Sequence, residues 1–234
     1  MKFPTKKWYQ AMQRSIWHVG LQASKEAETY SEEYFRRLYQ AEEQEMLDMK
    51  LYEPDVMKKK LAQMQRRYCR EIKKNVPADI LAQVADIRVL ALRTVSPAVL
   101  KAITAYCENN DRLVREAIST YDREYDAYCA AHPDWKNPLK GVWLHDSTIL
   151  AARKKGKDFI IQIENQGDSS PGFTIRFQNA TILHNEPPLA GAQWFYEALR
   201  ETNGQYELHM LAGRGQHLKE LILRADNIIL TSDE

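Results

Sequence analysis

The sequence has little glycine and cysteine, and it lacks any long apolar run. Only nine of its 234 residues are glycine, and none lies between Gly20 and Gly141. Because glycine is unfavourable inside helices and common in turns, this absence predicts that the first half of the chain is helical. No stretch approaches the roughly 18 consecutive apolar residues that cross a bilayer. The start, MKFPTKKWYQAMQ, also lacks the apolar segment of a secretory signal, so no membrane partner is predicted.

Cysteine and charge argue against several other classes of protein. No two of Cys69, Cys107 and Cys129 have the spacing of a metal-binding knuckle or of a redox motif. We expect buried free thiols, which are typical of a cytosolic protein. The net charge of +1 does not favour a nucleic-acid partner. The sequence also contains no phosphate loop, nucleophile elbow or zinc-protease signature, so we predict no cofactor, no metal and no identified catalytic residue.

Apolar residues recur at helical spacing in five segments between residues 5 and 131. Each segment starts near a residue that favours a helix N-terminus, in order Thr5, Ser24, Pro54, Pro77 and Pro97. The second helix is expected to run to about Leu51. The fifth is expected to bend or break at Asn109 and Asn110, because asparagine is a poor helix former. The pattern predicts a helical bundle over residues 1–135.

The pattern changes at HPDWKNPLKG, residues 132–141, where two prolines and a glycine interrupt the helical spacing. Short alternating runs follow, and the expected strands lie near residues 142–153, 157–164, 172–183, 192–200, 205–212 and 218–230. The segment 192–200 could instead be a short helix. Short connections favour an antiparallel sheet that curls into a β-sandwich or half-barrel over residues 138–234. The predicted fold class is therefore α+β.

Two segments of the second half share a pattern. IRFQNATI (175–182) and LRADNIIL (223–230) each alternate apolar residues, and each loses the alternation around one asparagine, Asn179 or Asn227. Asparagine tolerates the left-handed conformation, so the sequence predicts a bulge or bend at both places. Either two similar corners of the sheet or an internal duplication would explain the repeat.

The third expected helix carries an excess of positive charge. Its eight basic residues oppose only Asp55 and Glu71, whereas the segment before it has a charge of −5. One interpretation is an antiparallel helix pair in which the charged flanks face each other in part. The alternative is a polyanion-binding face, whose candidate residues lie opposite the apolar side of the helix. These residues are Lys59, Arg66, Arg70 and Lys73.

The second half holds the candidates for chemistry. Glu207 and His209 share one face of an expected strand, while Tyr206, Leu208 and Met210 would face the core. In a regular strand His145 and Asp146 would point to opposite faces, so they need a bend to form a pair. Either these four polar residues are structural or solvated, or they converge into a ligand-binding or catalytic site. The four candidates are His145, Asp146, Glu207 and His209.

Several short segments together indicate a family. They are Lys-Trp-Tyr at 7–9, LHD at 144–146, FQNATI at 177–182, GAQWFYEAL at 191–199 and YELH at 206–209. With them the sequence resembles, over essentially its whole length, an uncharacterised bacterial family, domain of unknown function 4085. The resemblance implies a two-part organisation and a bacterial cytosolic setting, and it implies no known activity, cofactor or ligand.

Three functional hypotheses follow from this sequence. The leading one is a non-catalytic module that binds a protein or a ligand, because no acid, base and nucleophile are recognisable together. The second is a small hydrolase or metal-assisted enzyme with its site on the β domain. The third is an immunity or antitoxin protein, since an exposed sheet can bind a partner by its edge or face. The partner is not identified by the sequence, and both a monomer and a homodimer are compatible with it.

Overall fold

The computed structural model describes residues 1–50, 53–164, 172–215 and 217–232. It divides into two compact units. The first contains residues 1–10 and 113–234, and the second contains residues 11–112. The division expected from the sequence, a helical bundle over 1–135 and a β domain over 138–234, stays a prediction.

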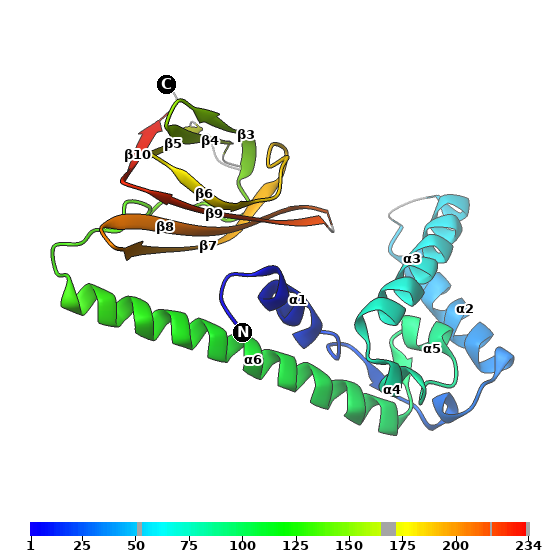
Figure 1. The fold of residues 1–234 in the computed structure, drawn as a ribbon. Helices are drawn as coiled ribbons and strands as arrows, with labels where there is room; N and C mark the ends of the chain where they lie inside the picture. The colour runs from blue at the N-terminus through cyan, green and yellow to red at the C-terminus, as the bar shows by residue number, and fades with distance from the viewer. Residues whose placement is uncertain (51–52, 165–171, 216, 233–234) are drawn as a thin grey trace. The chain divides into compact units, whose positions relative to one another are not determined.

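The described part of the first 131 residues is almost entirely helical (Figure 1). Its helices are α1 (Lys6–Ser15), the 3₁₀ helix η1 (Lys25–Glu28), α2 (Glu32–Asp48), α3 (Pro54–Asn75), α4 (Ala78–Leu81), α5 (Ile87–Ala91) and α6 (Pro97–Ala131). Two short strands, β1 (Gln22–Ala23) and β2 (Thr94–Val95), pair in parallel. The predicted helical character of the first half is confirmed. None of the described helices has the length and apolar character that a membrane span requires.

Three details of the helices differ from the prediction. The Ser24 side chain caps η1, and the Ser31 side chain caps α2 by accepting a hydrogen bond from the Tyr34 amide. The segment after Pro77 forms two short helices, α4 and α5, rather than one. α6 is continuous through its two asparagines, and the Asn110 side chain donates to the Tyr106 carbonyl oxygen at 2.8 Å within the helix.

The helical unit has its own apolar core. Buried side chains of α3, α5 and α6 meet there, among them Ile72, Leu90 and Ile103. Cys107 is fully buried in this core, and Cys69 is half-buried. All three cysteines are free thiols as predicted, but of the three only Cys107 is buried, and Cys69 and Cys129 are partly exposed. The unit is therefore held by apolar packing, with no disulfide among its described residues.

The second half forms one antiparallel sheet of eight strands. The strands are β3 (Thr148–Lys155), β4 (Asp158–Glu164), β5 (Phe173–Gln178), β6 (Thr181–Asn185), β7 (Gln193–Thr202), β8 (Gln205–Arg214), β9 (His217–Ala225) and β10 (Asn227–Ser232). Their order is β10-β5-β4-β3-β7-β8-β9-β6. The segment 192–200, for which a helix was the alternative, is part of β7. The predicted α+β class is confirmed.

The sheet bends at the two predicted asparagine positions. Asn179 separates β5 from β6 and has a φ of +50°, and Asp226 separates β9 from β10. Strand β5 pairs with β10, and β6 pairs with β9, so the two bent segments run side by side through both corners. The Asn179 side chain donates to Asp226 Oδ2 at 2.8 Å, which ties one corner to the other.

The bends fold the sheet into two layers around a second apolar core (Figure 1). Trp194, Phe177, Ile161 and Leu208 are fully buried in it. Strands β3 and β7 share the pair formed by Thr148 and Gln193, and four backbone hydrogen bonds of 2.8 Å join residues 146–149 to residues 191–194. The strand order ends at β10 and β6, so the half-barrel stays open.

The outer face of β7 is covered by aromatic residues from the chain start and from α6. Trp8 is only 1% exposed, and its ring centroid lies 4.9 Å from that of Tyr196 on β7. The Tyr9 ring stacks on Phe195 at 5.4 Å, and the Phe3 ring lies 5.3 Å from Tyr121 of α6. This packing explains why residues 1–10 belong to the same compact unit as the sheet.

Candidate functional site

His145 and Asp146 form a local pair at the surface. They lie in a turn before β3, which begins at Thr148 rather than near residue 142. Asp146 has a φ of +63°, and this left-handed turn brings its Oδ2 to 3.0 Å from His145 Nδ1. His145 and Asp146 are therefore not part of a regular strand, and the bend that a pair of these residues needs is present.

Two aromatic rings, those of Trp143 and Tyr196, lie close to the His145 ring. The Tyr196 ring meets the His145 ring edge to face, with 5.2 Å between centroids, and Trp143 nearby is 78% exposed. Glu197 accepts a hydrogen bond from the Trp194 indole at 2.7 Å, and burial raises the pKa of its carboxyl group. The side chains of His145 and Asp146 are both exposed, at 41% and 63%.

Glu207 and His209 lie on β8, in the interior of the sheet between β7 and β9. Leu208 and Met210 point into the β core, and the half-buried Tyr206 packs against it. Glu207 and His209 are therefore on the opposite face, as the alternation predicts. They are nevertheless only 8% and 7% exposed.

The Glu207 carboxylate is the centre of a charged network. Its Oε1 lies 2.8 Å from His209 Nε2, and its Oε2 accepts a hydrogen bond of 2.8 Å from Arg224 Nε. Strand register places Arg200 of β7 and Arg224 of β9 on either side of it. Arg200 Nε lies 3.4 Å from Oε1. Two arginines and one imidazole thus surround a single buried carboxylate.

This environment determines the protonation states of Glu207 and His209. Burial alone would raise the pKa of Glu207, but the hydrogen bonds from His209 and Arg224 outweigh it and lower that pKa. Burial lowers the pKa of His209, the Glu207 hydrogen bond opposes this, and the charges of Lys2 and Arg200 add to the lowering. At neutral pH the network therefore holds an ionised Glu207 and a neutral His209 that donates from Nε2. Both carboxylate oxygens of Glu207 are engaged, whereas the buried Arg200 Nε forms no hydrogen bond among the described residues.

The four β candidates form two pairs rather than one site. On β7 the neighbour of His209 is Ala198, whereas His145 contacts Tyr196, two residues further along that strand. In the described ranges, no group of three or more His, Cys, Asp or Glu side chains could hold a metal ion. The observed geometry is that of a surface pair and a buried ion network.

Arg200 and Arg224 were absent from the sequence candidates. No short-range spacing links either residue to Glu207, since their contact arises from strand register. The signal that could have found them is the pairing of β7, β8 and β9.

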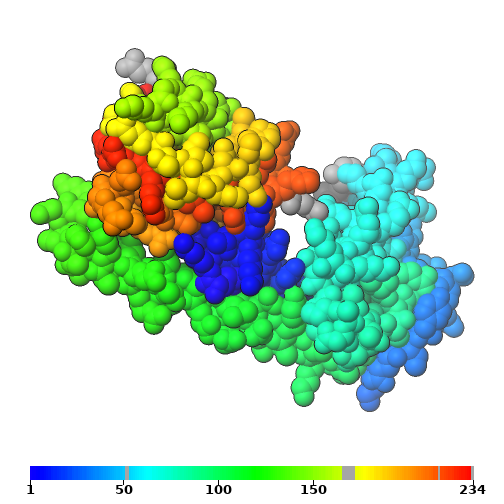
Figure 2. All heavy atoms as spheres, viewed as in Figure 1, coloured from blue at the N-terminus to red at the C-terminus, as the bar shows by residue number. Residues whose placement is uncertain are grey.

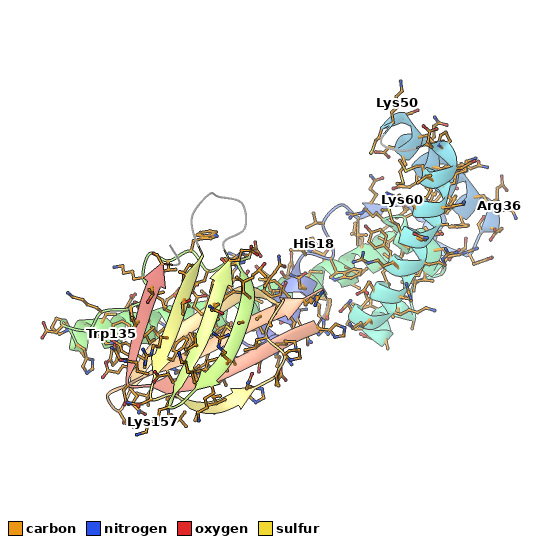
Figure 3. The ribbon with its side chains drawn as sticks, turned by 90° about the horizontal axis from the view of Figure 1, so that it is seen from above. His18, Arg36, Lys50, Lys60, Trp135 and Lys157 are labelled. Atoms are coloured by element: carbon orange, nitrogen blue, oxygen red, sulfur yellow. The ribbon has the colours of Figure 1, made fainter. Side chains whose placement is uncertain are left out.

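The basic candidates lie on the exposed face of α3. Helices α2 and α3 contact each other, and Lys58 of α3 forms an ion pair of 3.4 Å with Glu43 of α2. Figure 2 shows the atoms of α3, in cyan, at the surface, and Figure 3 labels Lys60 on this helix. The predicted charge pairing between the helices is therefore present in part.

Most of the positive charge on α3 is not used in that pairing. Six of its cations are exposed, and none of them has a carboxylate within ion-pair distance among the residues that the structure describes. They are Lys59, Arg66, Arg67, Arg70, Lys73 and Lys74. Helical geometry places them within about 120° of the helix circumference and along about 22 Å of its length. The candidates Lys59, Arg66, Arg70 and Lys73 form the middle of this basic stripe.

Comparison with known proteins identifies one family. Residues 4–215 match the family described as "Protein of unknown function (DUF4085)". The chain belongs to this family. No match was found among curated proteins or among solved structures. Membership in DUF4085 therefore extends over both compact units, and it assigns no activity to either one.

Proposed function

We propose that this DUF4085 chain is a non-catalytic protein-interaction module of the bacterial cytosol, and that the basic stripe of α3 binds an acidic segment of a partner protein. The observation that carries the proposal is the set of six exposed cations without carboxylate partners among the described residues. Three free cysteines support a reducing compartment. Membership in the family neither supports nor contradicts the binding function or the compartment.

Charge complementarity favours an acidic protein over a nucleic acid. The stripe is flanked by α2, whose acidic residues include Glu42, Glu43, Glu45 and Asp48. A duplex is wider than the stripe, so its phosphates would approach these carboxylates and be repelled. An acidic helix or extended segment is narrow enough to lie along α3 alone.

One contact supports the alternative hypothesis that the protein is an enzyme. The 3.0 Å approach of His145 Nδ1 to Asp146 Oδ2 would suit a proton-transfer pair. Glu207 and His209 do not add to it, since their polar atoms are engaged with each other and with Arg224. We therefore favour binding over hydrolysis. An immunity or antitoxin role is also a binding role, but it would use the edge or face of the sheet rather than α3.

The test compares two charge-neutralised variants of the full chain. One variant changes Lys59, Arg66, Arg70 and Lys73 to glutamine, and glutamine is chosen because added carboxylates would repel α2. The matched control changes four exposed cations of the β3–β4 hairpin to glutamine. These are Arg153, Lys154, Lys155 and Lys157. Both variants lose the same net charge.

Binding is measured by fluorescence anisotropy with a labelled oligoglutamate peptide and with a labelled DNA duplex. We expect the peptide to bind the wild type. Its affinity should be roughly tenfold or more weaker for the α3 variant, and the affinity lost in the control should be smaller. Added salt should weaken the complex, because the contacts are exposed. Tighter binding of the duplex than of the peptide, or equal losses in both variants, would overturn the proposal.

A further inference from the structure

The helical unit contains an apolar pocket that is separate from the basic stripe. Its volume is about 250 Å³, and all of its lining residues except Gln13 and Arg93 are apolar or aromatic. Its floor is part of the helical core and includes Ile72, Leu90 and Ile103. An apolar cavity of roughly 150 Å³ already accommodates benzene. This pocket can therefore hold a ring or a branched chain with a short extension.

The rim of the pocket is unusually apolar for a surface. Ile16 is 61% exposed and Val19 is 60% exposed, and both line the pocket together with the partly exposed Tyr68. Exposed apolar side chains that surround a concavity are typical of a ligand-binding site. Tyr68 and Ile72 lie on the side of α3 opposite Lys59 and Arg70, so the pocket and the basic stripe are different surfaces.

A single cation stands at this rim. Arg93 lines the pocket, and among described residues it has no carboxylate within ion-pair distance. Its Nη1 donates a hydrogen bond of 3.1 Å to the Val19 carbonyl oxygen. The guanidinium group has five N–H donors in total, so it keeps donors for another acceptor.

The backbone holds Arg93 in this place despite a conformational cost. Arg93 follows the end of α5 with a φ of +58°, a position that glycine usually occupies after a helix. Gly20, with a φ of +77°, lies against the guanidinium group, and a Cβ on Gly20 would be only 2.7 Å from Arg93 Nη1. A charged side chain therefore occupies a glycine position, and a glycine opposite makes room for it.

We propose that this pocket binds a small carboxylate with an apolar body, in which the body occupies the pocket and the carboxylate pairs with Arg93. The planar guanidinium group suits a two-oxygen anion. The apolar lining selects against hydrated inorganic anions, which would lose their water shell without replacement. This proposal does not depend on the α3 interface.

The test uses 3-phenylpropanoate and its neutral amide as probes of the full chain, with affinities measured by calorimetry. The carboxylate should bind roughly tenfold or more tightly than the amide, which is the ratio expected from one charge-assisted hydrogen bond. Arg93→Gly should remove that preference. Because φ is positive at this residue, the glycine variant should fold with an unchanged or higher Tm, so a lost preference reports the side chain.

The position of the ligand is read from isoleucine methyl resonances. The methyl groups of Ile16, Ile72 and Ile103 line the pocket and should shift on titration. Those of Ile161, Ile163 and Ile175 lie in the β core and serve as the control. No binding of either probe at millimolar concentration, equal affinities for both, an unchanged preference in Arg93→Gly, or shifts confined to the β core would each overturn the proposal.

Discussion

His209 Nε2 and Glu207 Oε1 lie 2.8 Å apart on the face of β8 that is turned away from the β core. The Arg224 guanidinium group completes the coordination of the carboxylate from the neighbouring strand. A Glu and a His two residues apart on a strand would suit catalysis. Here both side chains are buried, and their nearest polar atoms face each other rather than solvent.

The network predicts that substitutions of Glu207 and His209 reduce the stability of the protein by different amounts. Glu207→Gln leaves Arg224 without its carboxylate partner, and we expect the free energy of unfolding to fall by about 2–4 kcal/mol. His209→Gln keeps an amide donor near Glu207 and should cost at most about 1–2 kcal/mol. Urea denaturation measures both values. A larger loss for His209→Gln than for Glu207→Gln would contradict the central role of the carboxylate.

The same residues predict a loss of stability in acid. The pKa of His209 is lowered in the folded state from its ordinary value of 6.5, so the unfolded chain binds more protons below that pH. The stabilisation is complete above pH 6.5 and is lost as pH falls through the lowered pKa. Glu207, whose pKa is lowered from 4.5, extends the loss to still lower pH.

Thermal unfolding at a series of pH values from above 6.5 to below 4.5 tests this linkage. The decline in Tm just below pH 6.5 should be smaller in His209→Gln than in the wild type. His217→Gln, which changes an exposed histidine, serves as the control and should leave the profile unchanged. An identical profile in His209→Gln would show that other groups cause the decline.

The aromatic packing on β7 predicts that substitutions of Trp8 and Trp143 have very different effects on stability. Trp8 is 1% exposed, contacts Tyr196, and donates its indole N–H to the Val114 carbonyl oxygen at 3.4 Å. Trp8→Ala should lower the free energy of unfolding by about 3–5 kcal/mol. Trp143→Ala removes a side chain that is 78% exposed and should change it by less than about 0.5 kcal/mol. Chemical denaturation separates the two, and similar losses would refute the packing of the chain start on the sheet.

The close approach between Gly213 and Phe195 predicts that a substitution of Phe195 restores stability lost by a substitution of Gly213. A Cβ on Gly213 would lie 2.5 Å from Phe195 Cε2, at the place where the pairing of β7 and β8 shifts register. Gly213→Ala should therefore destabilise the protein by about 1–3 kcal/mol. The loss should shrink when Phe195→Leu is present, because the smaller side chain frees the space. A double-mutant cycle measures this coupling, and additive losses would contradict it.

The sequence predicted much of the local structure for simple physical reasons. Helical spacing and the absence of glycine indicated the helices, and alternation with turn residues indicated the strands. The bends at Asn179 and near Asn227 were also predictable, since a broken alternation and a residue that tolerates positive φ coincide there. The start of β3 was not, because the left-handed turn at Asp146 gives no signal in the spacing of apolar residues.

What the sequence determined by itself is therefore the type of each element, the change from helix to strand, and the shared face of Glu207 and His209. These depend on neighbours within a few positions along the chain. Only the tertiary structure decided that Arg200 and Arg224 flank Glu207, that Trp8 covers Tyr196, and that Arg93 stands at the rim of an apolar pocket. Such contacts join residues far apart in the chain, and they form because burying apolar faces fixes which strands and helices become neighbours.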